Sequence, residues 1–246
     1  MKVIFSLILI TVINVSNAMT VEEILDNADR VMGYTSLNHI SSIYYEAVTS
    51  MPGGVLGINY SGKNINKTFI KSGGKILIKE STLSKHNKIK RESQKGCDGS
   101  NCYSKDSGMG LRLLDGQEKD SLLRQNIFNS WRQLYSQYEL IGQEIIDGQQ
   151  CYKVLLNSQS GSKIINYYNT ENYLLVKSDA ISSPGFAEEI TSHFKYSNYT
   201  DIGHGLMMAK SLEINTMAMT LKIEIIDVKI NIEMPDEMFK LPDGLR

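Results

Sequence analysis

The three cysteines of this sequence, Cys97, Cys102 and Cys151, have the side chains with the most obvious chemistry. Cys97 and Cys102 flank residues 98–101, Asp-Gly-Ser-Asn, which are typical of a tight turn. A hairpin there brings the two sulfur atoms within bonding range, so in an oxidising compartment we predict a disulfide. Cys151 lies in a strand-like run, where a free thiol is usually buried and unreactive. No second close cysteine pair and no nearby histidine completes a tetrahedral ligand set, so we predict no metal site.

The histidines and the known short motifs give no indication of catalysis. Four histidines are scattered singly, at His39, His86, His193 and His204. The sequence contains no glycine-rich phosphate loop, no His-Glu-x-x-His, no Gly-x-Ser-x-Gly and no Cys-x-x-Cys. A Ser-His-Asp triad is recognised by its geometry, and a single histidine in a strand is usually structural. We therefore expect a protein that is not an enzyme and that binds no cofactor.

The charge balance argues against a nucleic-acid partner. The chain has 26 Lys and Arg against 27 Asp and Glu, which is close to neutral. Basic residues gather between residues 85 and 95, where an anion site is one interpretation. Polar and acidic residues interrupt this run, which favours the solvent-exposed face of a strand. The basic residues are Lys85, Lys88, Lys90, Arg91 and Lys95.

The first eighteen residues have the pattern of a cleaved secretory signal peptide. Lys2 supplies a positive charge, residues 3–15 carry none, and Ser16 and Ala18 place small residues where a signal peptidase needs them. A membrane anchor would need about 20 apolar residues, and this run is shorter. We predict cleavage after Ala18, export to the periplasm, and a soluble monomer formed by residues 19–246 as a single domain.

Helical periodicity occurs in two segments. Thr20 and Glu23 form a capping-box pattern, apolar residues then repeat at helical spacing, and Gly33 is placed to end the helix. A second amphipathic helix is predicted over residues 117–138, where apolar residues recur every three or four positions.

Elsewhere the apolar residues alternate, which predicts about eleven short antiparallel strands separated by Gly, Asn, Asp and Pro turns. In the last strand the alternation slips by one residue at Ile225 and Ile226. A β-bulge, which bends the sheet, explains this slip, and the alternative is that one strand ends there. The predicted strands cover residues 43–47, 55–60, 67–71, 75–80, 88–95, 139–146, 150–156, 163–169, 173–181, 186–199, 206–214 and 217–234.

The order of these features resembles the outer-membrane lipoprotein-sorting, LolA-like family of periplasmic proteins. The resembling stretches are residues 21–33 (VEEILDNADRVMG), 142–155 (GQEIIDGQQCYKVL), 167–176 (YYNTENYLLV) and 234–242 (MPDEMFKLP). The sequence departs from the family after Gly205, where Leu206, Met207 and Met208 stand in place of a proline.

The resemblance implies a mainly β (α+β) fold: a strongly curved antiparallel sheet forming an incomplete barrel, with two amphipathic helices as a lid over a hydrophobic cavity. It implies a carrier or chaperone whose ligand is a lipid, an acyl chain or an acylated lipoprotein, in transport toward the outer membrane with membrane-associated partner proteins. The alternative is a sensor or scaffold of the same fold, with a packed interior and a protein partner. The sequence does not decide between the two functions, because a leucine facing a cavity and a leucine in a core look alike in sequence.

Combining the helical and strand periodicities gives a set of apolar residues that point inward and are candidates for the lining of such a cavity. They are Ile24, Leu25, Ile43, Tyr45, Leu123, Ile127, Trp131, Leu134, Tyr152, Val154 and Phe194.

Overall fold

The structure, a computed structural model, describes residues 19–52, 63–84, 86, 88–182, 189–217 and 219–245. The predicted signal peptide (residues 1–18) and the predicted strand over residues 55–60 lie outside these ranges. Within the described ranges no helix is both long enough and apolar enough to cross a membrane.

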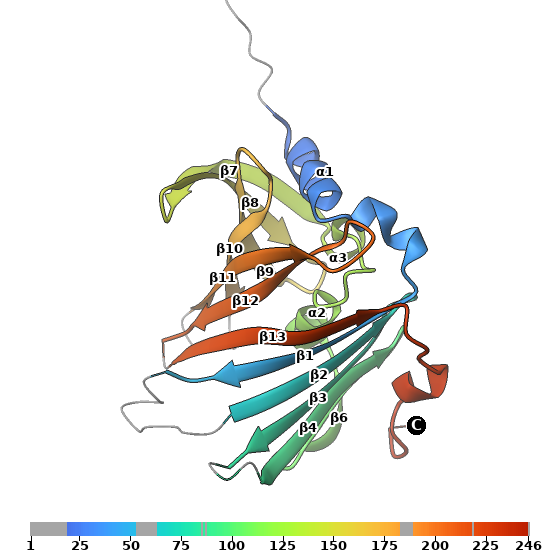
Figure 1. Ribbon diagram of the computed structural model, residues 1–246. Coiled ribbons are helices and arrows are strands. Elements are labelled where there is room, and N and C mark those ends of the chain that lie inside the picture. Colours follow the sequence, from blue (N-terminus) through green and yellow to red (C-terminus); the bar gives the residue numbers. More distant parts are fainter. Residues whose placement is uncertain are drawn as a thin grey trace, which may run out of the picture.

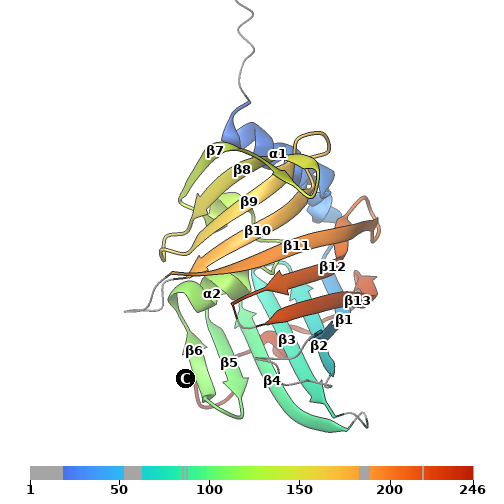
Figure 2. The same cartoon turned by 90° about the vertical axis from the view of Figure 1, so that its left-hand side faces the viewer.

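The described residues form one strongly bent antiparallel sheet (Figures 1 and 2). Its thirteen strands are β1 (Ser42–Ser50), β2 (Lys63–Lys71), β3 (Lys75–Leu83), β4 (Ile89–Asp98), β5 (Cys102–Asp106), β6 (Gly110–Leu114), β7 (Gln137–Ile146), β8 (Gln149–Asn157), β9 (Lys163–Asn169), β10 (Leu175–Ser182), β11 (Ile190–Asp201), β12 (Met207–Asn215) and β13 (Thr220–Ile230). Two meanders, β1 to β6 and β7 to β13, join where β1 pairs with β13. The edge strands β6 and β7 do not pair with each other, so the barrel is incomplete, which confirms the predicted fold class.

The strand pattern differs from the prediction at two places. The hairpin of β5 and β6 was not predicted, and β13 ends at Ile230 instead of Met234. The chain beyond β13 leaves the sheet because Ile232 and Met234 pack on its outer face, against Leu77. The short helix η2 (Asp236–Phe239) then buries Phe239 in the same cluster.

Helix α1 (Val21–Val31) begins where the sequence predicted. The Thr20 hydroxyl accepts a hydrogen bond from the Glu23 backbone N–H at 3.2 Å, and the Glu23 carboxylate accepts one from the Thr20 N–H at 2.8 Å. This complete capping box satisfies backbone donors that the helix itself leaves free. The buried face consists of Ile24, Leu25 and Ala28.

The end of α1 is fixed against the turn between β11 and β12. Gly33 has a φ of 78°, and a Cβ there would lie 2.2 Å from the Gly205 carbonyl oxygen. Glycine is therefore needed both for the left-handed backbone and for the close approach. The Met207 backbone N–H donates to the Met32 carbonyl at 3.0 Å, and the helix η1 (Tyr34–His39) follows.

The single helix predicted over residues 117–138 is wrong. The segment forms α2 (Gly116–Leu123) and the short α3 (Trp131–Leu134), and β7 has begun by Gln137. Together they carry the chain from the edge strand β6 to the opposite edge strand β7. In both views α2 lies between the two halves of the bent sheet (Figures 1 and 2).

Side-chain hydrogen bonds to the backbone explain the break between α2 and α3. The Asn126 amide donates to the Lys75 carbonyl at 3.0 Å, and its oxygen accepts from the Phe128 backbone N–H at 3.0 Å. Asn129 donates to the Leu123 carbonyl at 3.0 Å, and Ser130 begins a new helix with a capping box. Such bonds give the backbone an alternative to the helix.

The predicted β-bulge is confirmed in β13. Glu46 of β1 pairs with Asp227 and Ala47 pairs with Ile225, so Ile226 has no partner. Ile225 faces the inside of the sheet, whereas Ile226 is 58% exposed. The extra residue restores the alternation on the inner face and bends the sheet.

Two apolar clusters fill the concave side of the sheet. The first, here the helix-α1 core, packs α1 and α3 on strands β8 and β9; its buried members are Ile24, Leu25, Ala28, Trp131, Tyr135, Val154, Leu156, Ile164 and Tyr168. The second, here the helix-α2 core, packs α2 on the inner face of the other half; its buried members are Ile40, Ile43, Ile70, Ile76, Cys97, Cys102, Leu114, Leu122 and Leu206.

The predicted disulfide is confirmed. Cys97 and Cys102 are bonded across the hairpin of β4 and β5, where they are directly paired residues. Both sulfur atoms lie inside the helix-α2 core. Cys151 is a free, buried cysteine, and burial raises the pKa of its thiol.

Candidate ligand-binding cavity

An open cavity of about 400 Å³ lies on the concave side of the sheet, where the two cores leave the central strands uncovered. The middle of the sheet forms its floor, and α1, η1 and the segment after α2 form its walls. The lining residues are Ala28, Asp29, Met32, Tyr34, Tyr45, Ala47, Asn66, Thr68, Ile70, Ile78, Arg124, Gln125, Ile127, Tyr168, Leu175, Tyr196, Tyr199, Leu206, Met207, Met208, Ala209, Lys210, Leu212, Ile223 and Ile225.

Five tyrosines give the cavity an aromatic wall. Burial raises the pKa of every one of them, so at neutral pH they carry neutral hydroxyls. They therefore present uncharged rings to a ligand. The five are Tyr34, Tyr45, Tyr168, Tyr196 and Tyr199.

Hydrogen bonds occupy several of the polar atoms in this wall. The buried Ser178 hydroxyl donates to the Asn166 side-chain oxygen at 2.7 Å, and the Asn166 amide donates to the Tyr168 hydroxyl at 2.9 Å. The Tyr199 hydroxyl donates to the Leu175 carbonyl at 2.8 Å. Because their polar ends are bound to the protein, these tyrosines can offer a ligand an apolar ring.

Three charged residues also line the cavity. Burial, together with the nearby charge of Asp26, raises the pKa of Asp29 to about 6, although Arg132 acts in the opposite direction. Arg124 caps the C-terminus of α2, and Lys210 lies on β12. Neither cation has a side-chain hydrogen bond or ion pair with any of the described residues.

The predicted lining residues divide between the cavity and the cores. Tyr45 and Ile127 line the cavity. Ile43 is fully buried in the helix-α2 core, and Leu123 packs against that core. Phe194 is half-buried on β11, two residues from Tyr196 and on the same face. The remaining six belong to the helix-α1 core or pack against it: Ile24, Leu25, Trp131, Leu134, Tyr152 and Val154.

Sequence reasoning missed most of the cavity floor. Ile223 and Ile225 carried a usable signal, because the predicted slip at Ile226 already placed both on one face of the last strand. Tyr199 carried a weaker sequence signal. The alternation that places Tyr196 on the inner face breaks at Asn198, which has a positive φ of 57°, so the pattern alone does not place Tyr199 on that face. Arg124 and Lys210 carried no sequence signal, because only apolar residues were considered as candidates for the lining.

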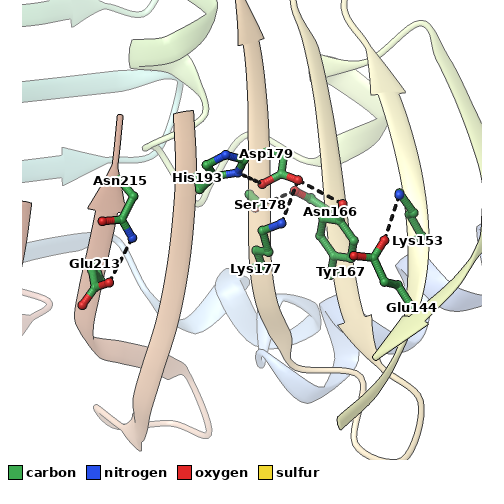
Figure 3. A network of polar contacts seen from close by, with 10 residues as sticks. All are labelled: Glu144, Lys153, Asn166, Tyr167, Lys177, Ser178, Asp179, His193, Glu213 and Asn215. Atoms are coloured by element: carbon green, nitrogen blue, oxygen red, sulfur yellow. Dashed lines mark hydrogen bonds and ion pairs between the residues drawn. The ribbon is translucent and has the colours of Figure 1, made fainter. Parts of the chain in front are cut away.

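The outer face of the same strands carries a polar cluster (Figure 3). Asp179 accepts hydrogen bonds from Lys177 at 2.9 Å, Tyr167 at 2.9 Å and His193 Nδ1 at 2.6 Å. Burial alone would raise the pKa of Asp179, but these three hydrogen bonds together lower it. Because its members come from β9, β10 and β11 and none lines the cavity, we interpret this cluster as a tie between strands.

Comparisons with known proteins identify the fold. No protein-family model matches this sequence, and neither does any curated protein. A LolA superfamily protein from Nitrosomonas europaea is similar in structure, with a TM-score of 0.63 and 15% identity over 91% of this chain and 98% of that one. A DUF1329 family protein from Desulfovibrio piger has a TM-score of 0.61 and 14% identity over the same shares.

A third solved structure, named as an outer membrane lipoprotein-sorting protein domain from Vibrio parahaemolyticus, has a TM-score of 0.56. Its identity is 8%, over 86% of this chain and 97% of that one. At such low identities the likeness concerns the fold alone. The resemblance seen in the sequence is thereby confirmed at that level, and the chain has the fold of the LolA superfamily structures.

Proposed function

We propose that this protein is an exported carrier that binds an acyl chain in the cavity, in the periplasm if the predicted signal peptide directs it there. The observation that carries the proposal is an open cavity of about 400 Å³ on the concave side of the sheet, between two packed cores. This volume falls in the range of roughly 300–1,000 Å³ that is usual for small-molecule sites. A sensor or scaffold with a solid interior would have no need of it.

The surface of the cavity suits an apolar chain. Isoleucine, leucine and methionine side chains cover the floor, and neutral tyrosine rings cover much of the wall. Each methylene group that moves from water into such a surface contributes about 0.8 kcal/mol. A chain of several methylene groups can therefore bind without specific hydrogen bonds, and the ligand class is a lipid or an acylated lipoprotein.

Filling the cavity from its floor tests the proposal. Ile225 lies beside the small side chain of Ala47, its partner on β1, which leaves room for a larger residue. We expect Ile225→Trp to abolish uptake of a fluorescent fatty-acid methyl ester while changing the melting temperature little, because the added ring occupies empty space.

The next residue provides the matched control. Ile226→Trp adds the same side chain to the same strand, but on the exposed outer face. It should bind the probe as the parent protein does. If the parent protein takes up no probe, or if Ile225→Trp is strongly destabilised and Ile226→Trp is not, the interior is solid and the carrier function is wrong.

A further inference from the structure

Two cations face the cavity without an acidic partner. Most other partly buried cations of the described chain have an acidic partner, among them Arg112 with Glu118 at 2.5 Å, and Lys71 and Lys75 with Asp236 at 2.6 and 2.7 Å. Arg124 and Lys210 are half-buried, line an apolar space and have no such partner. A charge beside apolar surface is unfavourable unless an opposite charge compensates it.

The two cations line the same cavity from different elements. Burial raises the pKa of Tyr196. A hydrogen bond to Ser178 and the positive charge of Arg124 both act to lower that pKa, so Arg124 lies near enough to Tyr196 for its charge to act on the hydroxyl. Lys210 lies two residues before Leu212, whose partner on β11 is Tyr196. Arg124 comes from the end of α2 and Lys210 from the sheet, and both side chains line the same cavity of about 400 Å³.

Asp29, the acidic residue of the cavity wall, forms no ion pair with either cation in the described chain. Asp29 lies on α1, and the charges that act on it are those of Asp26 and Arg132. Asp29 in turn raises the pKa of Tyr34 and Tyr168, after the larger effect of burial on each. Arg124 and Lys210 are thus not neutralised by the acidic residue that lines the cavity with them.

We propose that the ligand is an amphiphile with an anionic headgroup, a carboxylate or a phosphate ester, which Arg124 and Lys210 bind while the acyl chain lies on the apolar floor. This inference rests on the proposed carrier function and narrows its ligand class. The planar guanidinium of Arg124 can donate two parallel hydrogen bonds to such a group, and the Lys210 ammonium adds a second positive charge.

Two probes that differ only in charge test the headgroup. A fluorescent fatty acid and its methyl ester share the same chain, so the apolar cavity contributes equally to both. We expect the parent protein at pH 8 to bind the acid about 10-fold more tightly than the ester, which corresponds to one charge-assisted hydrogen bond. Arg124→Gln and Lys210→Gln should each reduce this preference, measured in each variant as the ratio of the acid affinity to the ester affinity.

Lys90→Gln is the matched control, because it removes the same charge from an exposed position on β4 that does not line the cavity. It should keep the preference for the acid. Inorganic phosphate at the concentration of the probe should not displace the fatty acid, because it lacks the chain.

The outcomes separate the two proposals. If the parent protein binds both probes equally, or if the two Gln variants keep the preference, the headgroup inference is wrong and the carrier function stands. If inorganic phosphate displaces the acid at equal concentration, the cations form a site for free anions and the headgroup inference is likewise wrong. If neither probe binds, the carrier function itself fails.

Discussion

The helix-α1 core and the cavity are built on neighbouring strands of one sheet, yet their surfaces differ. In the core, α1 and α3 cover Val154 and Leu156 so completely that neither exceeds 1% exposure. Over the central strands the described helices leave Leu212, Ile223 and Ile225 facing an open space. The difference lies in what covers each strand, because both surfaces present the same kinds of apolar side chain.

The same comparison holds for charge. Among the buried residues of the described chain, Asp179 on the outer face is the only Asp, Glu, Lys, Arg or His, whereas Asp29, Arg124 and Lys210 line the cavity. A packed core excludes a charge because the charge would lose its water there, and a cavity wall can retain one beside solvent or ligand. The position of charged residues thus separates the two surfaces more clearly than the apolar residues do.

The largest effect is expected from a matched pair of leucines on strands. Leu156→Ala should lower the free energy of unfolding by about 3 kcal/mol, because it leaves a void in a filled core. Leu212→Ala should cost about 1 kcal/mol, since one side of that leucine already faces empty space. Urea denaturation of the two variants measures both values. Equal losses would mean that the cavity floor is packed as tightly as the core.

A smaller loss is expected from the disulfide, which lies in the other closed core. The double variant Cys97→Ala, Cys102→Ala should lose about 2 kcal/mol, because the bond closes only a small loop in the unfolded chain. Since neither cysteine lines the cavity, affinity for a fluorescent acyl ester should not change. The same urea titration, with ester binding measured beside it, checks both expectations. A loss of binding would show that the cavity depends on the helix-α2 core.

The features that the sequence predicted depend on short segments. The capping box of α1 involves Thr20 and Glu23, three residues apart, and the bulge in β13 follows from the slip at Ile225 and Ile226. The disulfide required only a four-residue turn between the cysteines. In each case the residues that decide the structure are close together in the chain, so the pattern is visible without knowing the fold.

The features that it did not predict depend on contacts between distant residues. The break after α2 is fixed in part by Asn126, which bonds to the carbonyl of Lys75, 51 positions away. Helical spacing alone favoured a continuous helix there. Likewise Ile43 and Tyr45 share the inner face of β1, yet Ile43 is fully buried in the helix-α2 core, whereas Tyr45 packs at the margin of that core and lines the cavity. Periodicity identifies the inner face and cannot identify what covers it.

The smallest effect that separates the two surfaces concerns Asp29, whose pKa is raised to about 6 by burial and by Asp26. Between about pH 4 and pH 6 the Asp29 carboxyl group holds a proton in the folded protein and releases it in the unfolded chain. The contribution of Asp29 to the free energy of unfolding therefore falls as the pH rises. An asparagine at this position does not titrate. We therefore expect Asp29→Asn to match the parent protein near pH 4 and to exceed its stability by about 1 kcal/mol at pH 7, after allowance for partial solvent screening.

Urea denaturation at several pH values measures this difference. Asp227→Asn, on the outer face of β13 and paired there with Lys229, is the control and should give no gain above pH 6. Asp29→Asn should also strengthen binding of the fatty acid modestly at pH 8, because it removes a negative charge from the wall of the same cavity. If the two variants show the same dependence on pH, Asp29 titrates as an exposed residue does, and the cavity wall does not hold it away from water.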